Sequence, residues 1–143
     1  MIKAIIEIQL RKRISDKWGA GYFNAPRDGG KRSHAGIDYY VEPDAAILSP
    51  VSGKVTKLGY PYGDDLSFRY VEITDKDHSR HRVFYVEPTV EVGDKINEGD
   101  QIGVSQNLAT RYDTPEKGPM PNHVHYEIMV GQVHVDPEQY KQS

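Results

Sequence analysis

Two histidines separated by one residue, His123 and His125, are the first candidate functional residues in this 143-residue chain. They lie in an alternating run, 121–130, and in a β-strand every second side chain points to the same face. One face then carries His123, His125 and Glu127, and the other carries Val124, Tyr126 and Ile128. Neutral imidazole is both a zinc ligand and a base near neutral pH, so both rings can bind a metal, or one can bind it while the other moves protons. A half-exposed strand that happens to carry two histidines is the alternative.

A second pair of candidate ligands, His34 and Asp38, lies four residues apart. In an extended segment this even spacing keeps both side chains on one face, and the small Ala35 and Gly36 between them permit close approach to a ligand. Two histidines and one carboxylate form a known catalytic zinc set that leaves a coordination position for water or substrate. The two motifs together therefore predict a metal site.

Composition narrows the chemistry further. Cysteine is absent, which excludes disulfides, thiolate metal sites and cysteine nucleophiles, so any transition metal is held by histidine and carboxylate. A net charge of −3 gives no general electrostatic reason to expect nucleic acid or a membrane surface as a partner. The basic run 11–13 with Lys17 lies beside Glu7 and Asp16, and we interpret it as a solvated surface.

The elements that must position these residues are short strands separated by turns. Thirteen glycines, nine prolines and ten tyrosines favour a turn-rich β structure. Alternation predicts strands within 46–59, 69–74 and 81–86. No stretch has sustained helical periodicity with caps, so we expect an all-β fold, an antiparallel sheet of barrel-sandwich type with long loops. Residues 18–30 and 107–121 are expected to be loops, and the second is long enough to wall a site.

The length fits a single domain spanning residues 1–143, with an N-terminal strand and basic lead-in at 1–17 and the core at 18–140. Charges interrupt residues 1–10, which lack a long apolar core. We therefore expect no signal peptide and no membrane span there, and we expect a strand in the second half of this segment.

Four segments, spread over most of the chain and in the order that the family has, resemble the lysostaphin/LytM-type zinc metallopeptidase domain: 33–38, 47–55, 92–103 and 122–127. The resemblance implies a β-sheet fold with a groove, one zinc ion, and peptide cross-links of bacterial peptidoglycan as the substrate. By the same resemblance His34, Asp38 and His125 are the zinc ligands, and His123 acts on the metal-bound water. The Gly-Asp repeats in 92–103 also resemble half of a lipoyl or biotinyl carrier motif, but no lysine lies at a matching hairpin tip, so we interpret them as structural turns.

One position departs from the family pattern. Active members carry a second catalytic histidine before the Gly-Asp turn, and Tyr85 aligns with it. The surrounding Phe-Tyr-x-x-Pro segment, 84–88, is similar to that of leukocyte-derived chemotaxin, a zinc-binding relative that acts in signalling. A neutral phenol can still donate a hydrogen bond to a developing oxyanion, whereas a tyrosine turned into the core cannot. His81, four residues earlier and expected on the same face, is a second candidate for this role.

The remaining polar candidates have simpler interpretations. Glu127 either orients an imidazole or is a plain surface charge, and His78 and His134 are expected in surface or packing roles. Two functions stay open: a zinc endopeptidase acting on peptidoglycan with Tyr85 in place of a histidine, or a non-catalytic zinc-binding module that recognises a cell-wall glycopeptide or a protein partner. Without a signal peptide we expect synthesis in the cytoplasm, and release to the cell wall by a non-classical or phage lysis route is the export hypothesis. The sequence leaves the oligomeric state undetermined.

Overall fold

The computed structural model describes residues 11–13, 15–16, 19–27 and 32–140. The strand expected within 1–10 therefore lies outside the described residues. The described part is built almost wholly of antiparallel strands, as the alternating runs predict, and its only helical element is a short 3-10 turn, η2 (Leu108–Thr110). The all-β expectation is confirmed. No helix in the described part is long and apolar enough to span a membrane.

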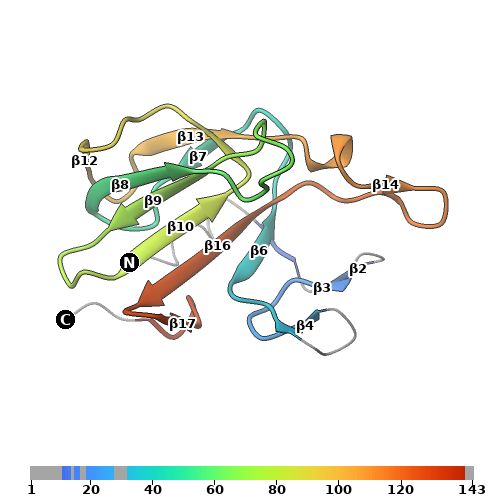
Figure 1. The fold of residues 1–143 in the computed structure, drawn as a ribbon, viewed down its shortest axis with the longest axis horizontal. Helices are drawn as coiled ribbons and strands as arrows, with labels where there is room; N and C mark the ends of the chain where they lie inside the picture. Colours follow the sequence, from blue (N-terminus) through green and yellow to red (C-terminus); the bar gives the residue numbers. More distant parts are fainter. Residues whose placement is uncertain (1–10, 14, 17–18, 28–31, 141–143) are drawn as a thin grey trace.

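The larger sheet runs in the order β1-β6-β16-β10-β9-β8-β12, with β17 also paired to β16 (Figure 1). The strands in that order are β1 (Arg11–Lys12), β6 (Ile37–Tyr40), β16 (His123–Val130), β10 (Arg80–Phe84), β9 (Tyr70–Thr74), β8 (Gly53–Gly59) and β12 (Lys95–Ile96). The additional strand, β17, spans Val133–Val135. The histidine strand is thus central, between β6 and β10.

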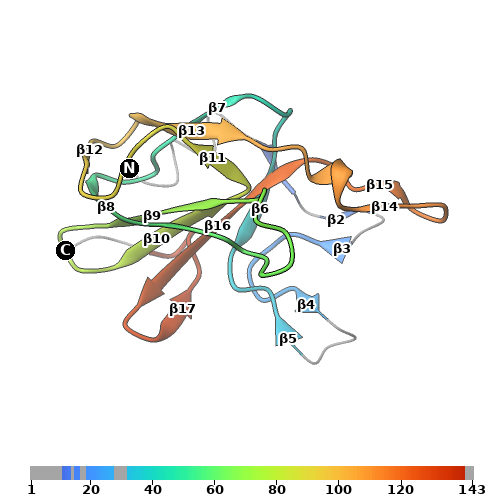
Figure 2. The same ribbon diagram turned by 45° about the horizontal axis from the view of Figure 1, so that its top comes forward.

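A smaller sheet of β11 (Val86–Pro88), β13 (Gln101–Ser105) and β7 (Ala46–Leu48) lies over one end of the larger sheet (Figure 2). Three short hairpins complete the described chain: β2–β3 (Ser15–Asp16 and Gly19–Ala20), β4–β5 (Pro26–Arg27 and Arg32–Ser33) and β14–β15 (Asp113–Thr114 and Gly118–Pro119). The β4–β5 and β14–β15 hairpins project from the same side of the molecule in both views (Figures 1 and 2).

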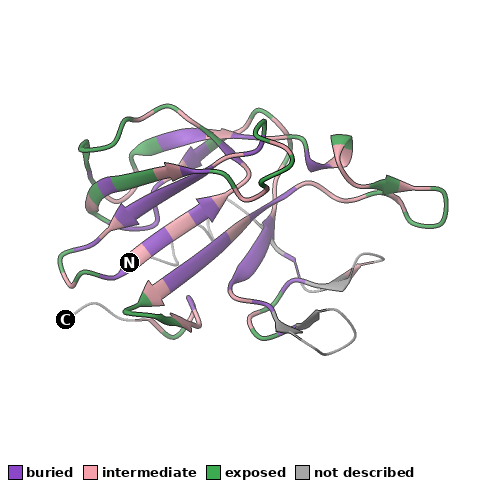
Figure 3. Cartoon of the chain, viewed as in Figure 1, coloured by how far each residue is buried: buried purple, intermediate pink, exposed green. Residues whose placement is uncertain are grey.

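The core takes apolar side chains from both sheets. The strands of both sheets accordingly carry buried residues (Figure 3). From the histidine strand the core receives Val124, Tyr126 and Ile128, all fully buried. Their burial fixes the opposite orientation for His123, His125 and Glu127, because a one-residue slip of register would exchange the two faces. The alternation in the sequence thus sets which face of β16 is available for chemistry.

A β-bulge interrupts the run that was expected to be one strand, 81–86. The N–H groups of Tyr85 and Val86 both donate to the carbonyl of Arg69, at 2.8 and 3.1 Å, and Tyr85 has a φ of 71°. Two residues of one strand opposite a single residue of the next define a β-bulge, and a bulge changes the direction in which the side chain points. Phe84 pairs with His125 across the sheet, so simple alternation would point Tyr85 into the core. Its phenol instead lines the same cavity as His125.

Candidate metal centre

Three predicted ligands come from two neighbouring strands and the bend before one of them. His125 on β16 is directly opposite Asp38 on β6, so the register of this pair brings their side chains together. His34 lies in the bend that precedes β6. Gly36 permits that bend to cross β16 closely, because a Cβ there would lie 2.2 Å from the carbonyl oxygen of Tyr126.

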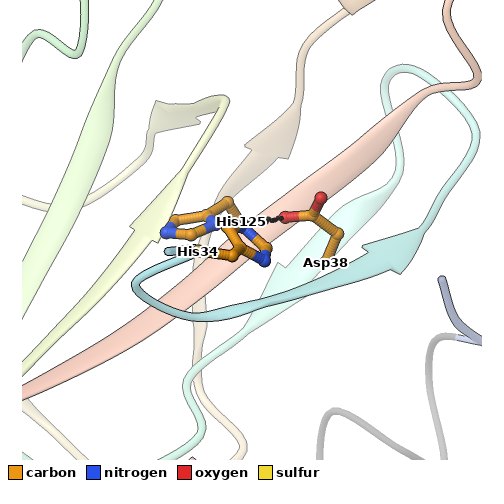
Figure 4. Close-up of side chains that lie close together, drawn as sticks. All are labelled: His34, Asp38 and His125. Carbon is orange, nitrogen blue, oxygen red and sulfur yellow. Dashed lines mark hydrogen bonds and ion pairs between the residues drawn. The ribbon is translucent and has the colours of Figure 1, made fainter. Parts of the chain in front are cut away.

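The inner atoms of these residues form a small triangle (Figure 4). His34 Nε2 lies 2.8 Å from His125 Nδ1, and Asp38 Oδ1 lies 3.1 Å from His125 Nδ1 and 3.2 Å from His34 Nε2. Ligand atoms around a tetrahedral zinc with bonds of about 2.0–2.1 Å lie roughly 3.3–3.4 Å apart. A slight opening of this triangle would therefore match a zinc ion.

Each ligand has an outer hydrogen bond that fixes its orientation. His34 Nδ1 donates to the carbonyl of Tyr22 at 3.1 Å, and His125 Nε2 donates to Glu127 Oε1 at 2.9 Å. A carbonyl and a carboxylate can only accept, so in the neutral rings the lone pairs are on the inner nitrogens. In the metal-free chain a proton on the inner nitrogen of His125 holds His34 and Asp38 at these distances, and a zinc ion would take the place of that proton. The donor set therefore fits zinc.

The pKa values of the ligands also favour a bound cation. Burial alone lowers the pKa of His125, but hydrogen bonds to Asp38 and Glu127 outweigh it and raise the pKa to about 9 in the metal-free chain. Burial would raise the pKa of Asp38, but the hydrogen bonds from His125 and His34 hold it well below its usual value. The centre thus retains a carboxylate and attracts positive charge.

Arg13 corrects one sequence interpretation. The basic run was expected to be solvated, but Arg13 is only 2% exposed, and its Nη1 donates to Asp38 Oδ2 at 2.7 Å. A second bond, from Nε to Asp16 Oδ2 at 2.7 Å, holds the guanidinium in place. Arg13 occupies one oxygen of Asp38 and leaves the other facing the histidines. The local sequence gave no signal of this, because the partner lies 25 residues away.

A cavity of about 280 Å³ adjoins the three ligands, and the two residues expected to be catalytic line it with them. His123 Nδ1 donates to the carbonyl of Pro121 at 3.0 Å, and its Nε2 lies 3.6 Å from Asp38 Oδ2. Burial lowers the pKa of His123, which favours the neutral ring. The ring of Tyr85 packs edge-on against His123, with centroids 5.6 Å apart. The cavity is completed by Arg13, Pro61, Tyr62, Phe84 and Met120.

Other candidate residues are placed elsewhere. His81 is not on this face: it is 1% exposed in the core, bonded to Asp75 and to the hydroxyl of Tyr126, so the expectation that it shares a face with Tyr85 is wrong. The bulge at Tyr85 breaks the even spacing on which that expectation rested. Glu127 is buried against His125 rather than being a plain surface charge, and His134 Nε2 lies 3.0 Å from its second oxygen. His78 lies in a turn with a φ of 64°.

The long connection 107–121 does reach the cavity, through Met120, and the hydroxyl of its Tyr112 bonds to that of Tyr62, which lines the cavity. Tyr62 is a cavity residue that the sequence did not single out, and Tyr112 is its neighbour. The only available signal was the abundance of tyrosine in otherwise polar loops.

Comparisons with known proteins agree with this geometry. Residues 32–137 match the model of peptidase family M23. The fold is similar to the catalytic domain of the antimicrobial peptidase lysostaphin from Staphylococcus simulans, with a TM-score of 0.67 and 22% identity over 96% of this chain and 95% of that one. It is also similar to a zinc-containing peptidase from Vibrio cholerae, with a TM-score of 0.63 and 19% identity over 94% of this chain and 40% of that one. A variant catalytic domain of the prophage-encoded protein EnpA from Enterococcus faecalis gives a TM-score of 0.63 and 20% identity over 90% and 98%.

A curated relative is an uncharacterized metalloprotease from Haemophilus influenzae, which is 26% identical over 131 residues. The match covers 91% of this chain and 25% of that protein, so the chain spans about a quarter of its relative's length. The structural matches establish the shared fold, and the family model covers most of the chain. The chain therefore belongs to peptidase family M23, a family of zinc metallopeptidases.

Proposed function

We propose that the protein is a zinc-dependent endopeptidase that hydrolyses peptide bonds of bacterial peptidoglycan. The observation that carries the proposal is the convergence of His34 Nε2, Asp38 Oδ1 and His125 Nδ1 beside a cavity that His123 and Tyr85 also line. Three protein ligands leave a tetrahedral ion one position for water or substrate. A bacterial target is supported by similarity to an antimicrobial peptidase.

The expected division of labour follows from the contacts of each residue. Zinc at this centre supplies a Lewis acid that polarises the scissile carbonyl and lowers the pKa of a water molecule toward about 7. His34, Asp38 and His125 hold the ion, and their outer partners keep the inner atoms in position. One ion is expected, since the described residues bring together one such ligand set.

His123 is the proposed proton carrier. Its Nδ1–H is committed to the carbonyl of Pro121, so Nε2 presents the lone pair that takes a proton from the attacking water and returns it to the leaving amine. The lowered pKa keeps this ring neutral, as a base near neutral pH must be.

Tyr85 is the proposed oxyanion donor. Burial raises its pKa to about 12, so the phenol stays protonated and can donate but carries no charge. Loss of one oxyanion donor costs about 2.7–4 kcal/mol of transition-state stabilisation, roughly a hundred- to a thousandfold in rate. A tyrosine in this position can therefore sustain catalysis if its O–H points toward the substrate.

The second candidate function is a non-catalytic zinc-binding module that recognises a cell-wall glycopeptide or a protein partner. The observation that favours it is the contact between the hydroxyls of Tyr85 and Tyr62, 3.2 Å apart, which occupies the group that would have to assist the reaction. An endopeptidase that cuts peptidoglycan would act at the cell wall, and release there by a non-classical or phage lysis route is the accompanying proposal.

Digestion of purified peptidoglycan by zinc-loaded protein, with released fragments identified by mass spectrometry, separates the two. An endopeptidase releases fragments with new peptide termini, and His125→Ala abolishes the release. Tyr85→Phe reports the contribution of the phenol. Stoichiometric zinc without release from several wall types would overturn the enzyme proposal in favour of the binding module.

A further inference from the structure

A chain of four polar groups leads from the surface to the metal centre. Arg111 Nε lies 3.2 Å from the hydroxyl of Tyr112, that hydroxyl lies 2.5 Å from the hydroxyl of Tyr62, and Tyr62 lies 3.2 Å from the hydroxyl of Tyr85. The four residues come from three separate segments: the connection 107–121, the loop 60–68 and the bulge between β10 and β11. Their order in space is therefore a product of the fold.

The donor at the outer end, Arg111, sets the direction of donation along this chain of hydrogen bonds. A guanidinium has only N–H donors and cannot accept, so the oxygen of Tyr112 accepts from Arg111 and its proton is donated to Tyr62. By distance alone, either hydroxyl could be the donor between Tyr62 and Tyr85. Because Tyr62 already accepts from Tyr112, its own proton is left for the hydroxyl of Tyr85. Tyr85 then accepts from Tyr62, and its own proton is directed away from Tyr62, in a side chain that lines the metal cavity.

Both ends of the chain are held firmly. The guanidinium of Arg111 stacks on the ring of Tyr62 at 3.8 Å and pairs with Asp64 at 3.3 Å and Asp65 at 3.6 Å. At the inner end the backbone of Tyr85 is fixed by the bulge, and its ring packs edge-on against Phe68. The freedom that remains is rotation of the O–H bond of each phenol, and the hydrogen bonds decide its orientation.

We propose that Arg111, Tyr112 and Tyr62 are positioning residues that direct the O–H of Tyr85 into the metal cavity as a hydrogen-bond donor. The proposal rests on the endopeptidase function for its kinetic consequence, because only an enzyme needs an oxyanion donor there. It also removes the objection that Tyr62 occupies the phenol: in this direction Tyr62 uses the oxygen of Tyr85 and leaves its proton for the substrate. A donor that is oriented beforehand needs no reorganisation during the reaction.

The first test needs no substrate. In zinc-loaded protein labelled with 13C at tyrosine Cζ, NMR resolves the hydroxyl proton of each phenol and its exchange with water. We expect the protons of Tyr112 and Tyr62 to exchange at least about tenfold more slowly than that of Tyr85, because they are bonded within the chain. In the wild-type protein, a Tyr85 hydroxyl proton that exchanges as slowly as that of Tyr62 would mean that Tyr85 donates to Tyr62. That result would overturn the proposal.

Reversal of the chain sharpens this test. Arg111→Glu replaces a pure donor by a carboxylate that can only accept, so each phenol should turn and the Tyr85 proton should become protected. Tyr112→Phe is the milder variant should the first not fold, and it should narrow the difference between Tyr62 and Tyr85. Asp64→Asn is the matched control, because it weakens the ion pair of Arg111 and keeps the N–H donor to Tyr112. It should leave the exchange pattern unchanged, and a loss of the pattern in this variant would also overturn the proposal.

The second test uses kinetics in a double-mutant cycle. Arg111→Glu should lower kcat at least about tenfold with little change in KM, and should have less than about a threefold effect once Tyr85→Phe is present. Equal effects in both backgrounds would show that Arg111 only holds the cavity wall. Absence of turnover in the wild-type protein would instead count against the endopeptidase function, and the NMR result would still decide the direction of the chain.

Discussion

Two histidines, the half-buried His125 and the buried His81, lie on opposite faces of the paired strands β16 and β10, and each contacts a carboxylate. His81 uses both ring nitrogens inside the protein: Nε2 donates to Asp75 Oδ2 at 2.8 Å, and Nδ1 accepts from the hydroxyl of Tyr126 at 2.8 Å. Tyr140 also donates to Asp75 Oδ2, at 2.6 Å. This cluster is satisfied by itself and lies in the core.

His125 differs in the groups that surround its inner nitrogen. That nitrogen lies within hydrogen-bond distance of both a second imidazole, His34, and a carboxylate, Asp38, at the edge of a cavity. The difference shows that a neighbouring carboxylate does not by itself identify a functional histidine. What distinguishes the two is that three potential metal ligands converge around His125, whereas His81 has one carboxylate and one hydroxyl.

The largest expected effect comes from His125→Ala. Removal of one ligand should weaken zinc binding by more than about a hundredfold, since loss of an outer partner alone costs 10–100-fold. Zinc content after dialysis and competition with a chromogenic chelator measure it. His81→Ala is the control, and its folded fraction should keep wild-type affinity. Stoichiometric zinc in His125→Ala would remove the distinction drawn between the two histidines.

The second effect concerns stability. His81→Ala leaves Asp75 buried without one of its partners, so we expect the free energy of unfolding to fall by about 3 kcal/mol. Urea denaturation of metal-free protein measures it. His134→Ala removes a far more exposed imidazole, whose side chain is 36% accessible, and should change stability by less than about 1 kcal/mol. Equal losses in the two variants would contradict a structural role for the His81 cluster.

A third, smaller effect tests the outer partner of His125. Glu127→Gln keeps the size of the side chain and removes its charge, so zinc affinity should fall about tenfold while the fold is retained. The same chelator competition measures affinity, and circular dichroism checks folding. Unchanged affinity would indicate that Glu127 serves packing alone.

The smallest effect is a pH dependence of stability. Burial lowers the pKa of His81 in the folded chain, although Asp75 opposes this, so near pH 6 the unfolded state binds more protons than the folded state. Stability from His81 is therefore present above its unfolded pKa of about 6.5 and is lost as the pH falls. We expect His81 to contribute a loss on the order of 1 kcal/mol between pH 7.5 and 5.5 in metal-free protein, opposed by a gain from His125, whose pKa is raised to about 9. His81→Phe should reduce this slope, and an unchanged slope would assign the dependence to other groups.

The fold and the position of the histidine strand could be read from the sequence because they depend on a local rule. Alternation in 121–130 places Val124 and Tyr126 in the core and His123 and His125 opposite them, whatever the rest of the chain does. The Gly-Asp repeats likewise form turns, in which Gly93 and Gly99 have φ of 99° and 92°. The same rule failed for His81 and Tyr85, because Tyr85 lies in the bulge between β10, which carries His81, and β11.

The sequence by itself determined the all-β architecture, the chemically active face of β16, and the residue types able to bind zinc without cysteine. Only the folded chain shows which nitrogen of His34 faces inward, which oxygen of Asp38 Arg13 occupies, and that Tyr85 leaves the core to join Tyr62 and Tyr112. The two sets of features differ in the distance along the sequence over which the interactions that set them act. Strand alternation acts between neighbouring residues, whereas these orientations depend on hydrogen bonds between groups 12 to 50 residues apart, and no local pattern encodes them.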